Sequence, residues 1–131
     1  MSTADHEFVA DCRVRAATDV LAHRWDPVVL AALGEGPARR GDLKTRIGGM
    51  QDKPLTETLA RLVRWGLVER ERHRESPQRV MYGLTALGRS LHDGPLTALA
   101  AWAVDHGDEL LRGQGEPVTG EKPLRAWILS R

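Results

Sequence analysis

The stretch GGMQDKPLTETLARLV, Gly48 to Val63, constrains the fold more than any other part of the chain. Its glycine pair ends whatever helix precedes it, because glycine readily takes the left-handed conformation in which helices stop. Apolar residues then recur at spacings typical of one helix face: Leu55, Leu59, Leu62 and Val63. Asp52 is the expected N-cap, with Pro54 tolerated in the first turn. The stretch therefore predicts a tight turn followed by an amphipathic helix with a polar outer face.

Three helices are predicted before this turn. Apolar residues near a 3.6-residue period indicate a first helix from Cys12 to Ala22. A second, mostly buried helix is expected in DPVVLAALGEG, with Asp26 as its N-cap and Pro27 at the first helical position. The third is a short helix in ARRGDLKTRIGG that turns Leu43 and Ile47 inward. The glycine pair ends this third helix.

A β-hairpin and a last helix are predicted after Gly66. The stretches LVERERHR and RVMYGLT alternate as strands do around the polar turn ESPQ. Thr85 is expected to cap a helix in ALGRSLHD. Gly94 and Pro95 are expected to break the chain before a long amphipathic helix, LTALAAWAVDHGDELLRG. Near the end of the tail, LRAWIL has the composition of a short docking segment.

Length and composition favour one folded domain. The chain has 131 residues, of which 41% are apolar and 28% charged, both ordinary values for a globular protein. The acidic start, MSTADHEF, does not resemble a leader, and no apolar run approaches a membrane span, so we expect a cytoplasmic protein without membrane contact. The single cysteine, Cys12, leaves a free thiol, a modified thiol or a bridge between two chains.

Basic charge is concentrated in the middle of the chain. The range from Arg39 to Arg79 holds 11 of the 19 Lys and Arg residues but 6 of the 18 Asp and Glu residues, which leaves 8 against 12 elsewhere. A basic segment beside an acidic remainder is typical of proteins that bind a polyanion. Taken alone, this asymmetry does not distinguish a nucleic-acid partner from none.

A short helix, a glycine turn and a helix with a polar outer face form a helix-turn-helix, and the hairpin after it would form a wing. In such a unit the second helix lies in the major groove of double-stranded DNA. Base contacts are expected from its first residues, and phosphate contacts from basic residues around them. The candidate DNA-binding residues are Arg39, Arg40, Lys44, Gln51, Lys53, Thr56, Glu57, Arg61, Arg72, Arg74 and Arg79. The alternative is that each of these charges is simply solvated.

The chain resembles the HxlR-type winged helix-turn-helix regulators, relatives of the MarR group. The resemblance lies in HRWDPVVLAALGEGPAR, DLKTRI, GMQDKPLTETLARLVRWGLVER and SPQRVMYGLTALGRSL, with Cys12 before them and the Trp102 helix after them. It departs from the family pattern at Arg40, where an aromatic residue is usual, at Gln51, where Ser is usual, and at Trp65, which would be exposed at a normally wet position.

The resemblance implies a mainly α-helical fold with a small β-hairpin wing. It also implies a homodimer joined by the first and last long helices, which binds inverted-repeat operators and represses or activates a neighbouring gene. Several family members sense oxidants or electrophiles through an N-terminal cysteine, and Cys12 stands at the matching place. The expected division is an N-terminal arm (1–11), a winged helix-turn-helix domain with dimerisation helices (12–112) and a C-terminal extension (113–131).

Four tryptophans against one Phe and one Tyr suggest a second kind of trigger. Flat rings can line a pocket for a small aromatic effector, and the candidates are Trp25, Trp65, Trp102 and Trp127. Since fold does not fix function, a protein of this fold that binds, sequesters or converts an aromatic metabolite without regulating DNA is the alternative. The sequence offers no catalytic constellation, no metal-ligand spacing among its five histidines and no cofactor motif, so we expect no enzyme and no cofactor.

Overall fold

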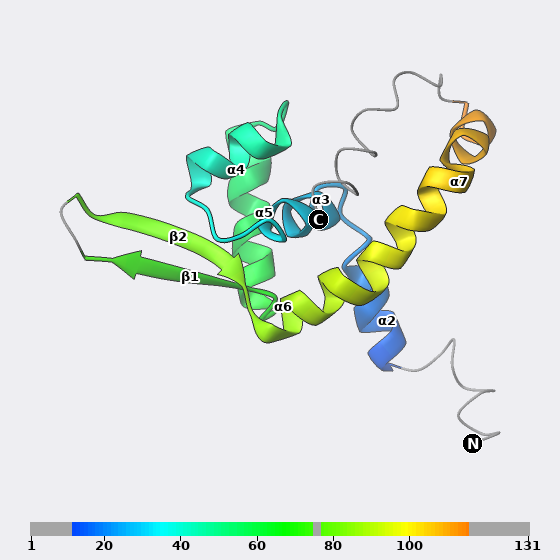
Figure 1. Cartoon of the computed structure of the whole chain (residues 1–131). Helices are drawn as coiled ribbons and strands as arrows, with labels where there is room; N and C mark the ends of the chain where they lie inside the picture. The colour runs from blue at the N-terminus through cyan, green and yellow to red at the C-terminus, as the bar shows by residue number, and fades with distance from the viewer. Residues whose placement is uncertain (1–11, 75–76, 116–131) are drawn as a thin grey trace.

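The computed structural model describes residues 12–74 and 77–115, and its order of elements is that of a winged helix-turn-helix. The elements are α2 (Cys12–Asp19), α3 (Asp26–Leu33), α4 (Arg40–Ile47), α5 (Asp52–Arg64), β1 (Val68–His73), β2 (Arg79–Leu84), α6 (Ala86–Leu91), η2 (His92–Leu96) and α7 (Thr97–Gly113). The hairpin and α7 extend to opposite sides of the helices α3, α4 and α5 (Figure 1). The predicted mainly helical fold with a hairpin wing is confirmed.

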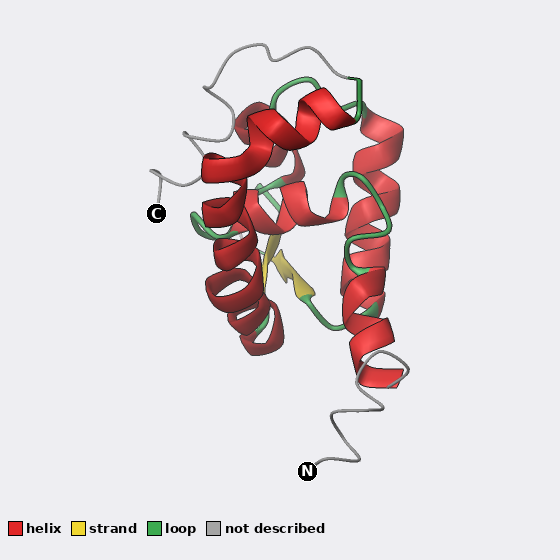
Figure 2. Ribbon diagram, turned by 90° about the vertical axis from the view of Figure 1, so that its right-hand side faces the viewer, coloured by secondary structure: helices red, strands yellow, loops and turns green. Residues whose placement is uncertain are grey.

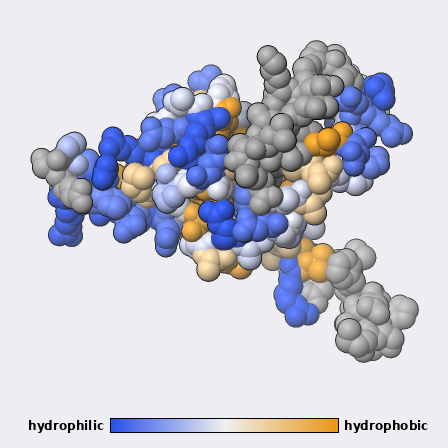
Figure 3. Space-filling model, viewed as in Figure 1, coloured by the Kyte–Doolittle hydropathy of each residue, from blue (hydrophilic) through white to orange (hydrophobic). Residues whose placement is uncertain are grey.

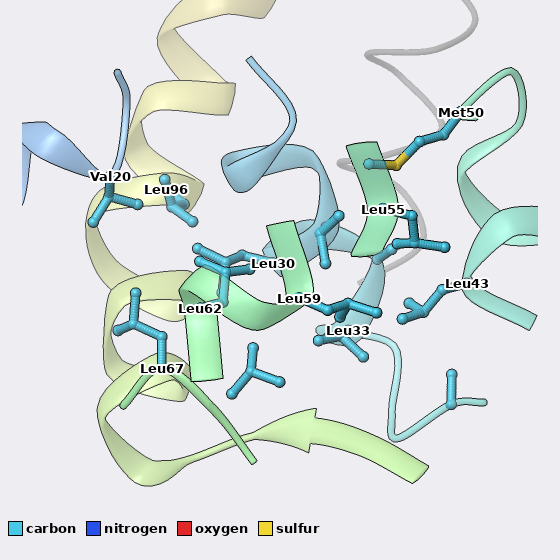
Figure 4. Packing of buried hydrophobic residues seen from close by; sticks show 14 residues of the cluster. Val20, Leu30, Leu33, Leu43, Met50, Leu55, Leu59, Leu62, Leu67 and Leu96 are labelled. Atoms are coloured by element: carbon cyan, nitrogen blue, oxygen red, sulfur yellow. The ribbon is translucent and has the colours of Figure 1, made fainter. Parts of the chain in front are cut away.

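The core lies where α3, α4 and α5 meet, and leucines fill it (Figure 4). Leu55 and Leu62 of α5 are fully buried against Leu30, Leu33 and Leu43 from α3 and α4. Each such side chain contributes about 1.5–3 kcal/mol by leaving water. The stripe read from the sequence is therefore correct along most of the helix. Two residues depart from it: Thr58, in the middle of the helix, is buried, and Val63, near its end, is exposed.

The glycine pair forms the turn between α4 and α5, as predicted. Gly48 and Gly49 have φ angles of 71° and 74°, a region that side chains with a Cβ rarely adopt. The Gly48 amide donates to the Lys44 carbonyl and so ends α4, and Met50 then inserts into the core. This turn fixes the direction in which α5 leaves.

Both predicted aspartate N-caps are wrong. The N-cap positions of α3 and α5 belong to Trp25 and Gln51, and neither side chain makes a cap hydrogen bond. Asp26 and Asp52 each lie one residue further on, inside the helix, where their carboxylates form ion pairs with other elements. The predicted cap at Thr85 is confirmed, because its hydroxyl accepts a hydrogen bond from the Gly88 amide at 3.0 Å.

The two strands form an antiparallel hairpin in which Val68 pairs with Leu84 and His73 with Arg79. At the other edge of β2, Ala38 exchanges two backbone hydrogen bonds with Tyr82, of 2.9 and 2.8 Å. Figure 2 shows the two strands (yellow) foreshortened, with helices to either side of them. The wing is thus attached to the helical part through the outer edge of β2.

The predicted break at Gly94 and Pro95 is wrong. The chain passes from α6 through the π-helical turn η2 into α7 without leaving a helical path (Figure 1). The wider turn accommodates Pro95, which lacks an amide proton. The Thr97 hydroxyl donates to the His92 carbonyl at 2.7 Å, and the His92 and Leu96 side chains are buried. The first helix is also shorter than predicted, since it ends at Asp19 and turns follow it.

The helices α2 and α7 pack little against the rest of the chain. No residue of α2 is buried, and Ala100 is the one buried residue that α7 contributes within the described part. Large apolar side chains are exposed on α7 instead: Leu99, Trp102, Val104, Leu110 and Leu111. All helices of residues 12–74 and 77–115 are too short or too polar to span a bilayer.

Candidate nucleic-acid interface

The outer face of α5 is polar and open to solvent. Its 13 residues span about 20 Å, which suits insertion of its first turns into a major groove. The exposed side chains on this face are Gln51, Lys53, Thr56, Glu57, Ala60 and Arg64. Gln51 is the N-cap residue of α5, and its backbone is extended. Its side-chain amide makes no hydrogen bond to the end of the helix. The buried leucines on the opposite face pack α5 against the core, so this polar face is directed to solvent.

Arg40, Lys44 and Asp52 meet where α4 approaches the start of α5. Lys44 Nζ lies 2.9 Å from Asp52 Oδ1, and Arg40 Nη2 lies 3.6 Å from the same oxygen. Arg40 also donates to the Asp52 carbonyl and to Thr56 Oγ1, both at 2.8 Å. The hydrogen bond and charge of Lys44, followed by the charge of Arg40, lower the pKa of Asp52 below its usual value. We call these three residues the α4–α5 charge cluster.

Arg61 does not lie on the outer face. Its Nε donates to Asp26 Oδ2 at 2.8 Å and its Nη2 to Oδ1 at 2.6 Å, a two-pronged ion pair between α5 and α3. Asp26 is fully buried, and the Arg61 side chain is 17% exposed. The hydrogen bond to Asp26 raises the pKa of Arg61. The expected phosphate contact from Arg61 is therefore revised to an internal ion pair, which holds α5 against α3.

Two further residues differ from the sequence interpretation. Arg46, which was not singled out, donates to the carbonyls of Ala32 and Gly36 at 3.1 and 2.8 Å and so secures the α3–α4 connection. Asp52 was expected only to cap α5, yet it is the common anion of the charge cluster. The signal available in the sequence was an acid in the first turn of a helix that follows a basic helix and a tight turn.

The two faces of the wing differ in charge. Directly opposed residues of an antiparallel pair share a face, so Arg70 and Arg72 lie with Tyr82 and Val80. The opposite face carries Glu69 and Glu71 with His73, Met81 and Arg79. Arg72, Arg74 and Arg79 are all exposed, as a backbone contact requires, but the register places Arg79 on the face opposite to Arg72. In Figure 3 the surface of the wing is mainly hydrophilic (blue), while hydrophobic residues (orange) reach the surface along α7.

Comparison with known proteins agrees with this geometry. Residues 20–110 match the sequence model of a family described as HxlR-like helix-turn-helix. The chain belongs to the HxlR-like helix-turn-helix family. It is 35% identical over 95 residues to the uncharacterized HTH-type transcriptional regulator YtfH of Escherichia coli, covering 72% of this chain and 75% of that one. This HxlR-like chain is a transcriptional regulator of the helix-turn-helix type.

Solved structures of related regulators share the fold. The reduced form of the transcriptional regulator YodB from B. subtilis superposes with a TM-score of 0.66 at 30% identity, covering 71% of this chain and 90% of that one. The redox regulator HypR in its reduced form gives a TM-score of 0.68 at 26% identity, covering 75% of this chain and 96% of that one. Both structures therefore match more than two thirds of this chain.

The tryptophans of this HxlR-like chain have different surroundings. Trp25 and Trp65 are half-buried against the core, so the expectation of an exposed Trp65 is wrong. Trp102 is 48% exposed and stacks on His106 with ring centroids 4.7 Å apart. It lines a shallow depression at the end of α7 whose other lining residues are His106, Glu109, Leu110, Gly113 and Gln114. Neither Trp25 nor Trp65 reaches this depression, and Trp127 lies outside the described residues.

Cys12 is a free, exposed thiol at the first residue of α2. Within residues 12–74 and 77–115, no group of three or more His, Cys, Asp and Glu side chains is placed to hold a metal ion. The predicted N-terminal arm and nearly all of the predicted C-terminal extension lie outside the described residues.

Proposed function

We propose that this protein is a homodimeric, cytoplasmic regulator that binds an inverted-repeat operator and controls a neighbouring gene. The observation that carries the proposal is the two-sided character of α5: leucines bury one face, while Gln51, Lys53 and Glu57 stand in solvent on the other. Lys53 can donate to guanine O6 or N7, Gln51 can pair with adenine, and Glu57 can accept from cytosine N4. These three side chains are the proposed base readers.

Thr56 has a narrower role in this proposal. Its hydroxyl accepts from Arg40 at 2.8 Å and lies 3.0 Å from the Asp52 carbonyl, to which it donates. With the hydroxyl engaged on both sides, the methyl group of this exposed residue is the part left for a base. Thymine presents a methyl group in the major groove. We therefore assign Thr56 an apolar contact with thymine.

Phosphate contacts are proposed for the exposed basic residues around α5. Arg39 precedes α4, Arg64 lies at the far end of α5, and Arg72, Arg74 and Arg79 lie on the wing. Such contacts carry no sequence information, but they hold the protein on the duplex and make binding depend on salt. Arg61 is left out because Asp26 holds it.

The exposed apolar residues of α7, with Leu21 after α2, support the proposed dimer. Large apolar side chains gathered on one element are a typical interface, and a two-fold dimer uses the same patch twice. Two copies of α5 related in this way would meet half-sites about 34 Å apart, one turn of the duplex. An inverted repeat is the sequence that such a dimer matches.

Two triggers are proposed, and Cys12 is the better supported. The thiol is exposed, and the fold neighbours include a redox regulator and a diamide-treated regulator. Oxidation would produce a modified thiol or a bridge between two chains. The second trigger is a small aromatic effector in the depression beside Trp102. Trp25 and Trp65 do not line this depression, and Trp127 lies outside the described residues, so Trp102 is the ring proposed to contact the effector.

Treatment with diamide distinguishes the two triggers. We expect oxidised wild type to lose operator binding and a Cys12→Ser variant to retain it, because the variant has no thiol. Tryptophan fluorescence against aromatic metabolites is the parallel measurement. Quenching by such a compound, with Cys12→Ser as sensitive to diamide as the wild type, would favour the effector instead.

A footprint on the DNA that flanks the gene tests the proposed function. We expect two protected half-sites, related as an inverted repeat and about 10 base pairs apart or a multiple of this. Wild-type protein that protects no segment of the flanking DNA at low salt would contradict the proposal.

A further inference from the structure

The α4–α5 charge cluster contains two cations and one anion at the entrance to the recognition helix. Asp52 Oδ1 lies within 2.9 Å of Lys44 Nζ and within 3.6 Å of Arg40 Nη2. The carboxylate itself is open to solvent, with its side chain 71% exposed, whereas the two cations are 42% and 35% exposed. The negative charge of the cluster is therefore more open to solvent than either of the positive charges that it holds.

An anion in this place weakens attraction to the phosphate backbone. A free lysine or arginine that meets a phosphate releases a counterion, and each such contact adds about 0.9 to the salt dependence of binding. A cation that is already paired must first exchange its carboxylate for the phosphate, so its net gain is smaller. An aspartate carboxylate is ionised at neutral pH, and the hydrogen bond and charge of Lys44 lower the pKa of Asp52 further. The weaker attraction to phosphates and the smaller net gain of each paired cation act on DNA of any sequence.

Arg40 also has a task that a phosphate contact would disturb. It donates to the Asp52 carbonyl and to Thr56 Oγ1, both at 2.8 Å, and so joins the first turn of α5 to α4. If Arg40 moved to contact a DNA phosphate, it would release the Thr56 side chain. By keeping Arg40 in place, Asp52 helps to hold the outer face of α5 in one arrangement.

We propose that Asp52 is a specificity-determining residue, which suppresses binding to arbitrary DNA by holding Lys44 and Arg40. The inference rests on the proposed function, since it assumes that α5 enters the major groove. Specificity is a ratio of affinities, and it improves when the wrong partner is penalised as well as when the right one is favoured. Asp52 supplies the penalty, while base contacts from α5 supply the preference.

The test compares full-length wild type with an Asp52→Asn variant on the footprinted operator and on a scrambled fragment of equal length, over a series of salt concentrations. Asparagine keeps the size and the backbone carbonyl but removes the charge. We expect affinity for the scrambled fragment to rise at least several-fold, with a steeper salt dependence, and affinity for the operator to rise less. The ratio of operator to scrambled binding should therefore fall.

Asp42→Asn is the matched control, because Asp42 is an exposed acid in the first turn of the neighbouring helix α4. An equal effect of both variants would mean that only net charge matters, and it would overturn the inference. In a Lys44→Ala background the effect of Asp52→Asn should shrink markedly, and an undiminished effect would overturn it as well. A wild type that prefers no sequence would instead contradict the proposed function and the inference with it.

Discussion

Single side chains decide how α5 is held. Asp26 is fully buried, and a buried carboxylate is costly unless a cation and hydrogen bonds satisfy it. Arg61 of α5 satisfies both oxygens at once. The periodicity of the sequence placed Arg61 on the solvent-exposed face of α5. Helical spacing alone does not reveal that its buried partner, Asp26, lies 35 positions away. Long-range pairing of this kind lies outside what local spacing predicts.

Removal of Arg61 should destabilise the fold rather than weaken DNA binding alone. Arg61→Ala leaves the buried Asp26 carboxylate without its cation, so we expect the free energy of unfolding to fall by about 3–5 kcal/mol. Denaturant titration measures this change. Arg64→Ala, an exposed neighbour on the same helix, should alter stability by no more than about 0.5 kcal/mol. Unchanged stability in Arg61→Ala, together with weaker binding to all DNA, would return Arg61 to the phosphate contacts.

At the scale of elements, the sequence predicted most of the fold correctly because local signals were strong. The glycine pair, the leucine stripe of α5 and the alternating strands each lie within one short segment, and all three were found where expected. The errors occur where another element intervenes. Pro95 did not break the last helix, because burial of His92 and Leu96 keeps the chain helical through η2.

The junction between the wing and α6 should tolerate no added side chain. Gly88 lies in α6 directly against the Leu67 carbonyl, and a Cβ at Gly88 would collide with that backbone oxygen. We expect Gly88→Ala to lower the free energy of unfolding by about 1–3 kcal/mol, measured by thermal or denaturant unfolding. Gly41→Ala in α4 is the control, since its surroundings are open and alanine favours a helix. A Gly88→Ala protein as stable as the control would show that the junction is looser than described.

At the scale of the molecule, α7 has an apolar surface without a cover in the described chain. Substitution of Trp102 by Glu places a charge in the proposed dimer interface, so we expect the protein to become monomeric at concentrations where wild type is dimeric. Sedimentation analysis gives the state, and circular dichroism verifies the fold. Asp108→Ala, on the same helix, should stay dimeric. A Trp102→Glu protein that remains a dimer would place the interface elsewhere.

The sequence predicted the outer face of α5 better than any other part of the site. It predicted the charge cluster and the tryptophan pocket least well. Gln51, Lys53 and Glu57 are exposed as periodicity implied. The charge cluster required the three-dimensional approach of α4 and α5, which no spacing encodes. Of the four tryptophans expected to share a pocket, the described residues bring only Trp102 to the depression on α7. A pocket between separate elements is not predictable from residue type.

The central claim is that the outer face of α5 reads bases while the wing holds phosphates. The most direct test measures the affinities of wild type, Lys53→Ala and Arg74→Ala for the operator and for a scrambled fragment at several salt concentrations. We predict that Lys53→Ala loses about 1–3 kcal/mol on the operator and much less on scrambled DNA. Arg74→Ala should lose equally on both and reduce the salt slope by about 1. Binding of both fragments by both variants at wild-type affinity would contradict the account.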